Sequence, residues 1–307
     1  MCGRMHHIMN KNEHFKSGFV AVVGRPNVGK STLINALIGD KIAIVSDKAQ
    51  TTRNRIICVY TDEAKQIVFM DTPGVHKPKH KLGEFMVDAA IESLKETEAV
   101  LFVVAGNEKR GPGDNFIIEQ LKRVKVPVFL VVNKIDTLKK EERLEAIVSY
   151  QDAYPFAGVI PISAKDKENL NEVLNVLEET LPEGPRYFPE DMITDQPERL
   201  IISDIVREKI LLATRDEIPH AIAVDVDEMK TRDDGTTYIR ATIYCERDSQ
   251  KGIIIGKKGA LLKQLGAEAR VDIQKLLATK VYLDLWVKVK KDWRNKSGML
   301  SELGYRK

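Results

Sequence analysis

The stretch GRPNVGKS, residues 24–31, decides the fold of this chain. It follows an apolar run at residues 19–23 and precedes a helical pattern, so it is a G-x-x-x-x-G-K-S loop between a strand and a helix. Glycines let such a loop point its amides at phosphate oxygens, and the helix N-terminus adds partial positive charge. We expect Lys30 at the β and γ phosphates of a nucleotide and the Ser31 hydroxyl on Mg²⁺. The predicted nucleotide contacts here are Gly24, Asn27, Val28, Gly29, Lys30, Ser31 and Thr32.

Around this loop, residues 18–181 alternate short apolar runs with amphipathic stretches. This pattern is typical of an α/β domain with a mostly parallel sheet and helices on both faces. Ligands of such sheets bind at loops beyond the carboxyl ends of the strands, where the motifs of this domain all fall. We expect strands at residues 19–23, 56–60, 66–70, 99–104, 128–132 and 158–161.

The next motif, DTPG at residues 71–74, follows an apolar run that ends in IVFM. An aspartate here can meet the magnesium ion, and a glycine amide can sense the γ-phosphate. Between the two motifs lies QTT, residues 50–52, where a threonine can close over the metal when the γ-phosphate is present. The two threonines leave the ligand open. The predicted metal ligands are Ser31, Asp71 and Thr51 or Thr52, and the predicted catalytic residues are Lys30, Thr51, Thr52 and Gly74.

Two later motifs predict which base is bound. NKID, residues 133–136, ends the run VPVFLVV, and a carboxylate at Asp136 can accept hydrogen bonds from N1 and the exocyclic amine of guanine. Adenine offers neither donor, so we expect a buried Asp136 to reject ATP. SAK, residues 163–165, follows the last strand and can place amides at the guanine carbonyl. The predicted base contacts are Asn133, Lys134, Asp136, Ser163, Ala164 and Lys165.

The ordered motifs resemble those of the translation-factor-related GTPases. Ras-like enzymes place a glutamine directly after the last glycine of the second motif to orient the attacking water, whereas this chain has Val75. Because valine cannot hydrogen-bond to water, the resemblance implies slow intrinsic hydrolysis that is assisted from elsewhere. Asn27 matches a position that helps to hold K⁺ near the phosphates in several relatives. An asparagine that merely orders the loop is the alternative.

The second half of the chain shows another order of elements. Residues 182–197 contain four prolines and no periodicity, which indicates a stiff linker. Residues 198–307 then show an α+β pattern in the order αββααβ, with IGKKG at residues 255–259 between the two adjacent helices. Residues 251–307 hold 14 Lys and Arg against 5 Asp and Glu, a local net charge of +9 on a chain of net charge +3. This balance favours a polyanionic partner, although a solvated charged face is the alternative.

A GKKG turn in an αββααβ order resembles a type II KH domain. Glycines allow a single-stranded nucleic acid to approach the backbone, the lysines face its phosphates, and an apolar groove holds about four bases. The predicted RNA contacts are Ile255, Gly256, Lys257, Lys258 and Gly259.

Taken over residues 18–307, the chain resembles the Era family of bacterial ribosome-assembly GTPases. The resemblance rests on the GTPase motifs with Val75, on QTTR at residues 50–53, on the proline-rich linker, on the KH pattern and on LDLWVKVKKDWR at residues 283–294. It implies GTP or GDP with Mg²⁺ as ligands, GTP hydrolysis, binding to the 3′ region of 16S rRNA, and a role in 30S subunit assembly. For residues 1–17 we expect a disordered tail.

Composition excludes several other classes. The 307 residues, 43% of them hydrophobic, suffice for two cores, and three distant cysteines argue against a disulfide framework or zinc site. The apolar runs are too short to span a bilayer, so we expect a soluble protein. The cysteine pattern fits a reducing cytosol. We also expect a monomer, with peripheral contact to the inner face of the membrane left open. Two other functions stay open as alternatives: a GTPase acting in RNA modification, and a static RNA-binding protein whose nucleotide is structural.

Overall fold

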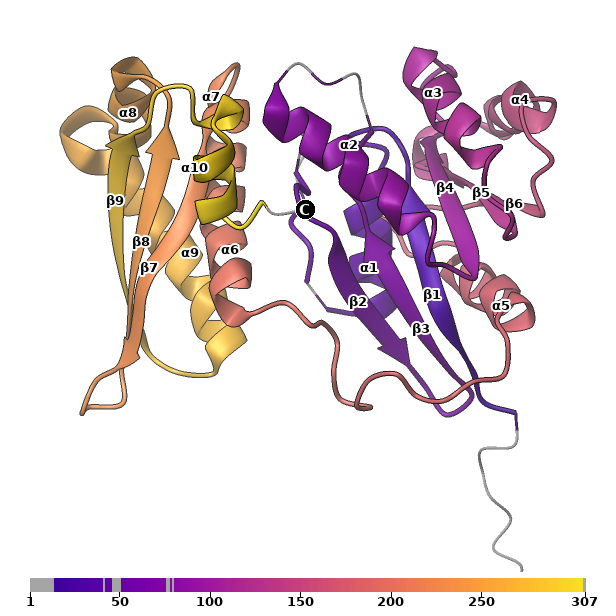
Figure 1. The fold of residues 1–307 in the computed structure, drawn as a ribbon, viewed down its shortest axis with the longest axis horizontal. Coiled ribbons are helices and arrows are strands. Elements are labelled where there is room, and N and C mark those ends of the chain that lie inside the picture. The colour runs from indigo at the N-terminus through magenta and orange to yellow at the C-terminus, as the bar shows by residue number, and fades with distance from the viewer. Residues whose placement is uncertain (1–13, 41, 46–50, 76–77, 79, 306–307) are drawn as a thin grey trace, which may run out of the picture.

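The computed structural model describes residues 14–40, 42–45, 51–75, 78 and 80–305, which form two sheets with their helices (Figure 1). Residues 1–13 of the predicted tail, and Gln50 of the QTT segment, lie outside the described residues. The first strand begins at Lys16, three residues before the expected residue 19, because Lys16–Gly18 pair in register with residues of the neighbouring strand β3. The expected tail therefore overlaps this strand at its last two residues.

The N-terminal domain is built on a six-stranded sheet in the order β2-β3-β1-β4-β5-β6. All neighbouring strands are parallel except β2 and β3, which form an antiparallel pair, so the predicted α/β class is confirmed. The strands are β1 (Lys16–Val23), β2 (Ile56–Thr61), β3 (Lys65–Asp71), β4 (Ala99–Ala105), β5 (Val128–Asn133) and β6 (Gly158–Pro161).

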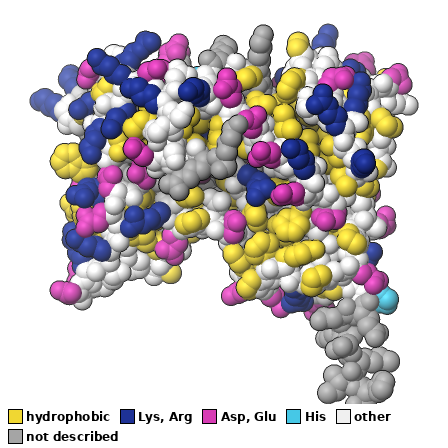
Figure 2. All heavy atoms as spheres, viewed as in Figure 1, with side chains coloured by type: hydrophobic (Ala, Val, Ile, Leu, Met, Phe, Trp, Pro, Cys, Tyr) yellow, Lys and Arg dark blue, Asp and Glu magenta, His cyan; other side chains and the backbone are white. Residues whose placement is uncertain are grey.

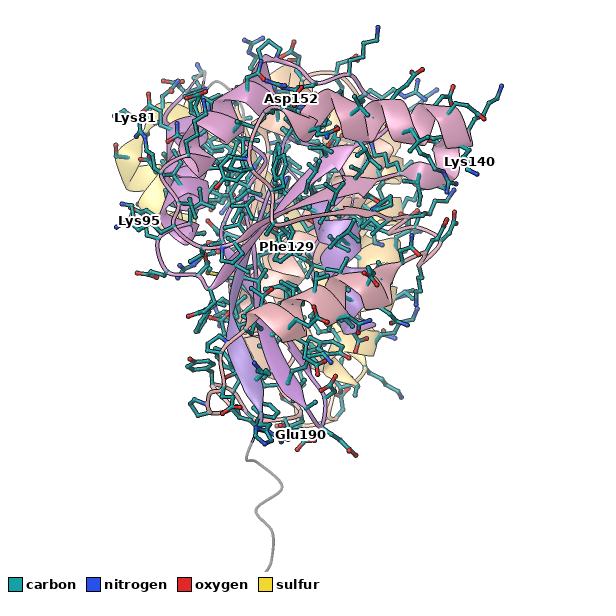
Figure 3. The ribbon with its side chains drawn as sticks, turned by 90° about the vertical axis from the view of Figure 1, so that its right-hand side faces the viewer. Lys81, Lys95, Phe129, Lys140, Asp152 and Glu190 are labelled. Carbon is teal, nitrogen blue, oxygen red and sulfur yellow. The ribbon has the colours of Figure 1, made fainter. Side chains whose placement is uncertain are left out.

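Helices cover both faces of this sheet because alternate apolar residues of each strand point to opposite sides. Val20 and Val22 pack with α1 (Lys30–Ile38) and α5 (Leu170–Thr180). Ala21 and Val23 belong to the opposite core. That core holds residues of α2 (Lys81–Ser93), α3 (Pro112–Leu121) and α4 (Lys140–Gln151). Figure 3 shows the sheet, at Phe129 of β5, between α4 and α5.

The proline-rich linker is fastened to the N-terminal domain along its length. Val59 of β2 donates its amide to the Ile193 carbonyl at 2.9 Å, and the Thr194 hydroxyl donates to the Ile57 carbonyl at 2.7 Å. Buried Gln66 accepts from the Tyr187 amide at 2.7 Å through its side-chain oxygen. Hydrogen bonds to β2 and β3, and not proline stiffness alone, therefore hold the linker in position.

The C-terminal domain has a three-stranded sheet in the order β7-β8-β9, with β7 and β8 antiparallel and β8 and β9 parallel. The predicted αββααβ order is confirmed by α6 (Glu198–Ala213), β7 (Ala223–Thr231), β8 (Thr237–Cys245), α8 (Asp248–Ile255), α9 (Ala260–Leu277) and β9 (Val281–Val289). Two short helices were not expected: α7 (Ile218–Ala221) and α10 (Ser297–Glu302). None of the helices within the described ranges is long and apolar enough to cross a membrane.

Candidate nucleotide site and RNA-binding turn

The P-loop enters α1 through Gly29, whose φ of 99° lies in the left-handed region. A Cβ at this glycine would lie 2.2 Å from the Asn133 amide nitrogen. That amide donates to the Val28 carbonyl at 2.9 Å, and its oxygen accepts from the Ala164 amide at 3.0 Å. Asn133 therefore ties together the three segments that carry the GKS, NKID and SAK motifs.

Lys30 is buried at the start of α1, with its side chain over the loop. Its ammonium donates to the Arg25 carbonyl at 3.0 Å and to the Gly24 carbonyl at 3.3 Å. Burial lowers the pKa of Lys30 to about 8, while the nearby Asp71 carboxylate opposes that shift. A buried cation beside a glycine loop is suited to receive an anionic phosphate.

Three side-chain oxygens converge beside this lysine. The Ser31 hydroxyl donates to Asp71 Oδ2 at 2.8 Å, the Thr52 hydroxyl donates to the same oxygen at 3.1 Å, and the two hydroxyls are 3.0 Å apart. Asp71 Oδ1 is buried without a hydrogen-bond partner among the described residues, and burial raises the pKa of this carboxyl group. Hydroxyl and carboxylate oxygens are ligands that Mg²⁺ accepts, so the residues fit that ion.

The structure separates the two threonines that the sequence left open. Thr52 places its hydroxyl in the oxygen cluster and is 6% exposed. Thr51 instead offers its backbone carbonyl to Arg207 of α6. Gly74 lines the same pocket as Lys30. The other predicted residues in that pocket lining are Asn27, Gly29, Ser31, Thr32, Thr51 and Thr52.

The residues predicted to read the base form one loop cluster. Ser163 donates its hydroxyl to Asp136 Oδ1 at 2.9 Å, which orients the carboxylate. Asp136 is exposed, so the expectation of a buried carboxylate is wrong, because the loop after β5 ends at the protein surface. A bound base, and not the protein alone, would have to cover it. Lys134 has a left-handed φ of 67°, and Lys165 is exposed.

Val75 stands where related enzymes carry a glutamine, and it is 4% exposed within the core against α2. Its amide donates to the Gly24 carbonyl at 3.2 Å, so the DTPG segment is joined to the P-loop. An apolar residue packed in this way cannot orient water.

The GKKG turn joins α8 to α9. Gly256 has φ of 72°, and a Cβ there would lie 2.7 Å from Leu261 Cβ, so a side chain cannot be fitted. Lys257 and Lys258 are both exposed, whereas Ile255 and Gly259 are half-buried. Behind the turn, a groove between α9 and β9 is lined by Gly259, Leu262, Lys263, Gly266, Ala267, Arg270, Tyr282, Leu283 and Leu285. Apart from Gly259, sequence patterns did not single out these groove residues for RNA, because the apolar ones among them follow the helix and strand periodicity of a core.

The contact between the two domains adds residues that sequence reasoning missed. Arg53, directly after Thr52, is 2% exposed and donates to the Ile222 carbonyl at 2.6 Å. Its guanidinium lies 5.7 Å from the ring centre of buried Trp293. On the other side, Glu208 of α6 accepts from the Val45 amide at 3.2 Å. The QTTR motif was the available signal in the sequence, but it does not indicate that Arg53 contacts the C-terminal domain.

These sites and folds define a P-loop GTPase that carries a C-terminal KH domain. Residues 19–134 match the family described as "50S ribosome-binding GTPase", and residues 217–294 match the KH domain family. The chain is 57% identical over 292 residues to GTPase Era of Alkaliphilus oremlandii (strain OhILAs), which covers 95% of this chain and 99% of that relative. It therefore belongs to the Era family of GTPases.

Two solved structures match nearly the whole chain. A crystal structure of Era with MgGDPNP and nucleotides 1506–1542 of 16S ribosomal RNA has a TM-score of 0.93 and 43% identity, covering 96% of this chain and 100% of that one. A variant of Aquifex aeolicus Era bound to GDP·AlF4⁻ has a TM-score of 0.92 and 42% identity, covering 95% and 100%. The relative positions of the two domains in this chain therefore have counterparts in known Era structures.

Proposed function

We propose that this protein is a GTP-hydrolysing switch that binds the 3′ region of 16S rRNA through its KH domain and assists assembly and maturation of the 30S subunit. The observation that carries the proposal is the match of both domains to an Era structure that holds this RNA and MgGDPNP. The description that names the 50S subunit applies to residues 19–134 alone, so the match over both domains favours the small subunit.

Within the nucleotide site, we assign phosphate binding to Lys30 and the P-loop amides, and guanine recognition to Asp136 with the SAK loop. Ser31, Thr52 and Asp71 would hold Mg²⁺, since their oxygens already converge and Asp71 Oδ1 lacks a partner among the described residues. When bound, the ion neutralises charge on the phosphates during attack by water. Gly74, which lines the same pocket as Lys30, would sense the γ-phosphate, and assistance in place of a glutamine would come from outside Val75.

The two threonines provide a test with a built-in control. Thr52→Ala removes a hydroxyl from the oxygen cluster and should lower Mg²⁺-dependent GTP hydrolysis roughly 100-fold or more, as loss of one transition-state contact does. Thr51→Ala keeps the carbonyl that Arg207 contacts and should change the rate only a few-fold. Single-turnover hydrolysis at saturating GTP measures both, with Lys30→Ala as the inactive reference. A Thr51→Ala enzyme that fails while Thr52→Ala turns over normally would reverse the assignment.

We further propose that the protein acts as a monomer in the cytoplasm, with peripheral membrane contact left open.

Asn27 has φ of 65° and lies in the lining of the nucleotide pocket, which is compatible with a K⁺ site and equally with an ordering role in the loop. Comparing the GTP turnover rate in K⁺ and in Na⁺ separates the two roles, because equal rates would exclude a K⁺-binding role for Asn27.

A further inference from the structure

One face of the KH sheet is only partly covered: α10 packs at the end that holds Ala223 and Tyr244, and the other end carries exposed side chains of β9. Its inner face packs on α6 and α9 through residues such as Ile239, Ala241 and Val287. The opposite residues of β8 and β9 form pairs in register, with Tyr238 beside Tyr282 and Arg240 beside Asp284. Figure 2 shows many Lys and Arg side chains over the part of the molecule where this sheet lies in Figure 1.

Two aromatic side chains stand exposed on this outer face. Tyr282 is 54% exposed and Trp286 is 55% exposed, and both belong to the edge strand β9. Scattered exposed aromatics are ordinary, but these are held in fixed orientations. The indole of Trp286 donates to Asp284 Oδ2 at 2.9 Å, and the Tyr238 hydroxyl donates to the same oxygen at 3.2 Å. One carboxylate therefore satisfies both polar groups, and the ring of Trp286 stays exposed.

Cations accompany these rings. The rings of Tyr238 and Tyr282 stack with centroids 5.9 Å apart, and the Arg232 guanidinium lies 4.9 Å from one and 5.0 Å from the other. Exposed Lys288 follows Trp286 by two residues on the same face of β9, since strand residues alternate. Aromatic rings interleaved with Lys and Arg are the arrangement on which single-stranded nucleic acids stack their bases.

Tyr282 also lines the groove behind the GKKG turn. An RNA strand that leaves this groove across the edge of β9 therefore meets the outer face without a gap. We propose that the outer face of the KH sheet, at Tyr238, Tyr282, Trp286 and Lys288, is a second RNA-contact surface that stacks bases of single-stranded RNA beyond those held in the groove. The inference rests on the proposed RNA binding and extends its footprint from one side of β9 to the other.

The test uses the full-length protein and RNA spanning nucleotides 1506–1542 of 16S rRNA, the segment in the matched Era complex. Trp286→Ala should weaken its binding roughly 5- to 150-fold, the loss that one stacked base brings. Six-nucleotide RNAs tiled across the same segment serve as a control. Because the groove takes about four bases, one of these short RNAs should bind in the groove with the same affinity in the wild type and in Trp286→Ala. Lys288→Gln should reduce the salt slope of the long RNA by about 1. Phe116→Ala, which removes a 42% exposed ring from α3, is the matched control.

A second readout comes from fluorescence, because the chain has two tryptophans and Trp293 is fully buried. Long RNA should quench the Trp286 emission, and Trp286→Phe should lose this quenching while it keeps affinity near the wild-type value. Two results together would overturn the proposal: Trp286→Ala binds the long RNA as tightly as the wild type, and the RNA still changes the tryptophan emission of this variant. The outer face would then not be an RNA surface, and a protein partner would be the remaining occupant. Failure of wild-type protein to bind any of these RNAs would contradict the proposed function itself.

Discussion

Lys30 is a buried cation whose charged form is disfavoured by that burial. Burial lowers its pKa to about 8 from the ordinary 10.5. A triphosphate beside the ammonium favours the charged form and raises that pKa again. Below pH 8 the free protein already carries the proton, whereas above it the proton has to be taken up when nucleotide binds. The affinity for GTP should therefore fall as pH rises past 8.

Proton uptake is the direct sign of this linkage. Calorimetry of GTP binding in two buffers of different ionisation enthalpy should give uptake approaching one proton at about pH 9 and none from Lys30 at about pH 6.5. Asp71 has the opposite sign, because its raised pKa would make Mg²⁺ binding release a proton on the acid side. Absence of uptake at the higher pH would show that Lys30 is already charged in the free protein, so that burial does not lower its pKa.

Asp136 carries the prediction for base selectivity. Asp136→Asn should weaken GTP binding and strengthen binding of xanthosine triphosphate, whose C2 carbonyl suits an amide donor. In the wild type, ATP should bind roughly 10⁴-fold more weakly than GTP, although exposure of the free carboxylate makes this discrimination depend on the base closing the site. Titration with the three nucleotides measures both effects. Unchanged GTP affinity in the variant would mean that Asp136 does not contact the base.

Among the elements, the turn between α8 and α9 sets RNA binding. Lys257→Asp combined with Lys258→Asp puts two carboxylates where phosphates are expected and should abolish binding of RNA 1506–1542 while GTP affinity stays unchanged. Lys122→Asp with Lys125→Asp on the GTPase domain makes the same change of net charge and is the control. Filter binding at two salt concentrations decides the matter, since wild-type affinity in the turn variant would place the RNA elsewhere.

The elements of both domains followed from the sequence because their signals are local. The P-loop, the apolar strands and the glycines of GKKG report their own backbone requirements, and β6 has the bounds, residues 158–161, that the sequence predicted. Contacts between distant segments left no such signal. Periodicity could not tell that Thr52 and not Thr51 faces Asp71, that Asp136 is exposed, or that the linker docks beside β2. These facts depend on how the loops close over each other in space.

In the whole molecule, the KH domain reaches the nucleotide site through α6. Arg207 donates to the Thr51 carbonyl and forms an ion pair with Asp204 at 3.2 Å. Thr52, which directly follows Thr51, contributes its hydroxyl to the oxygen cluster. A separate hydrophobic cluster joins the two domains from the other side, with Leu82 and Met86 of α2 packed against Trp293 and other C-terminal residues. A rearrangement driven by the γ-phosphate would therefore be felt by the RNA-binding domain.

Arg207 offers a way to uncouple the two domains. Arg207→Ala should reduce the effect of the γ-phosphate on RNA affinity by about 0.5 to 2 kcal/mol while both ligands still bind. Arg199→Ala is the matched control, because Arg199 lies on the same helix and donates to the Val226 carbonyl at 3.3 Å within its own domain. A complete thermodynamic cycle with RNA and nucleotide measures the coupling. Equal coupling free energies in the wild type and in Arg207→Ala would show that this contact does not transmit the effect of the γ-phosphate to the RNA-binding domain.

The central claim is that γ-phosphate sensing and RNA binding are linked in one chain. The most direct measurement is the dissociation constant for RNA 1506–1542 with a non-hydrolysable GTP analogue, with GDP and without nucleotide, at fixed salt and Mg²⁺. We predict tighter binding with the analogue than with GDP, by the roughly 1 to 3 kcal/mol typical of coupled sites, and the same factor for the effect of RNA on analogue binding. Three equal constants would contradict the switch and leave a static RNA-binding protein.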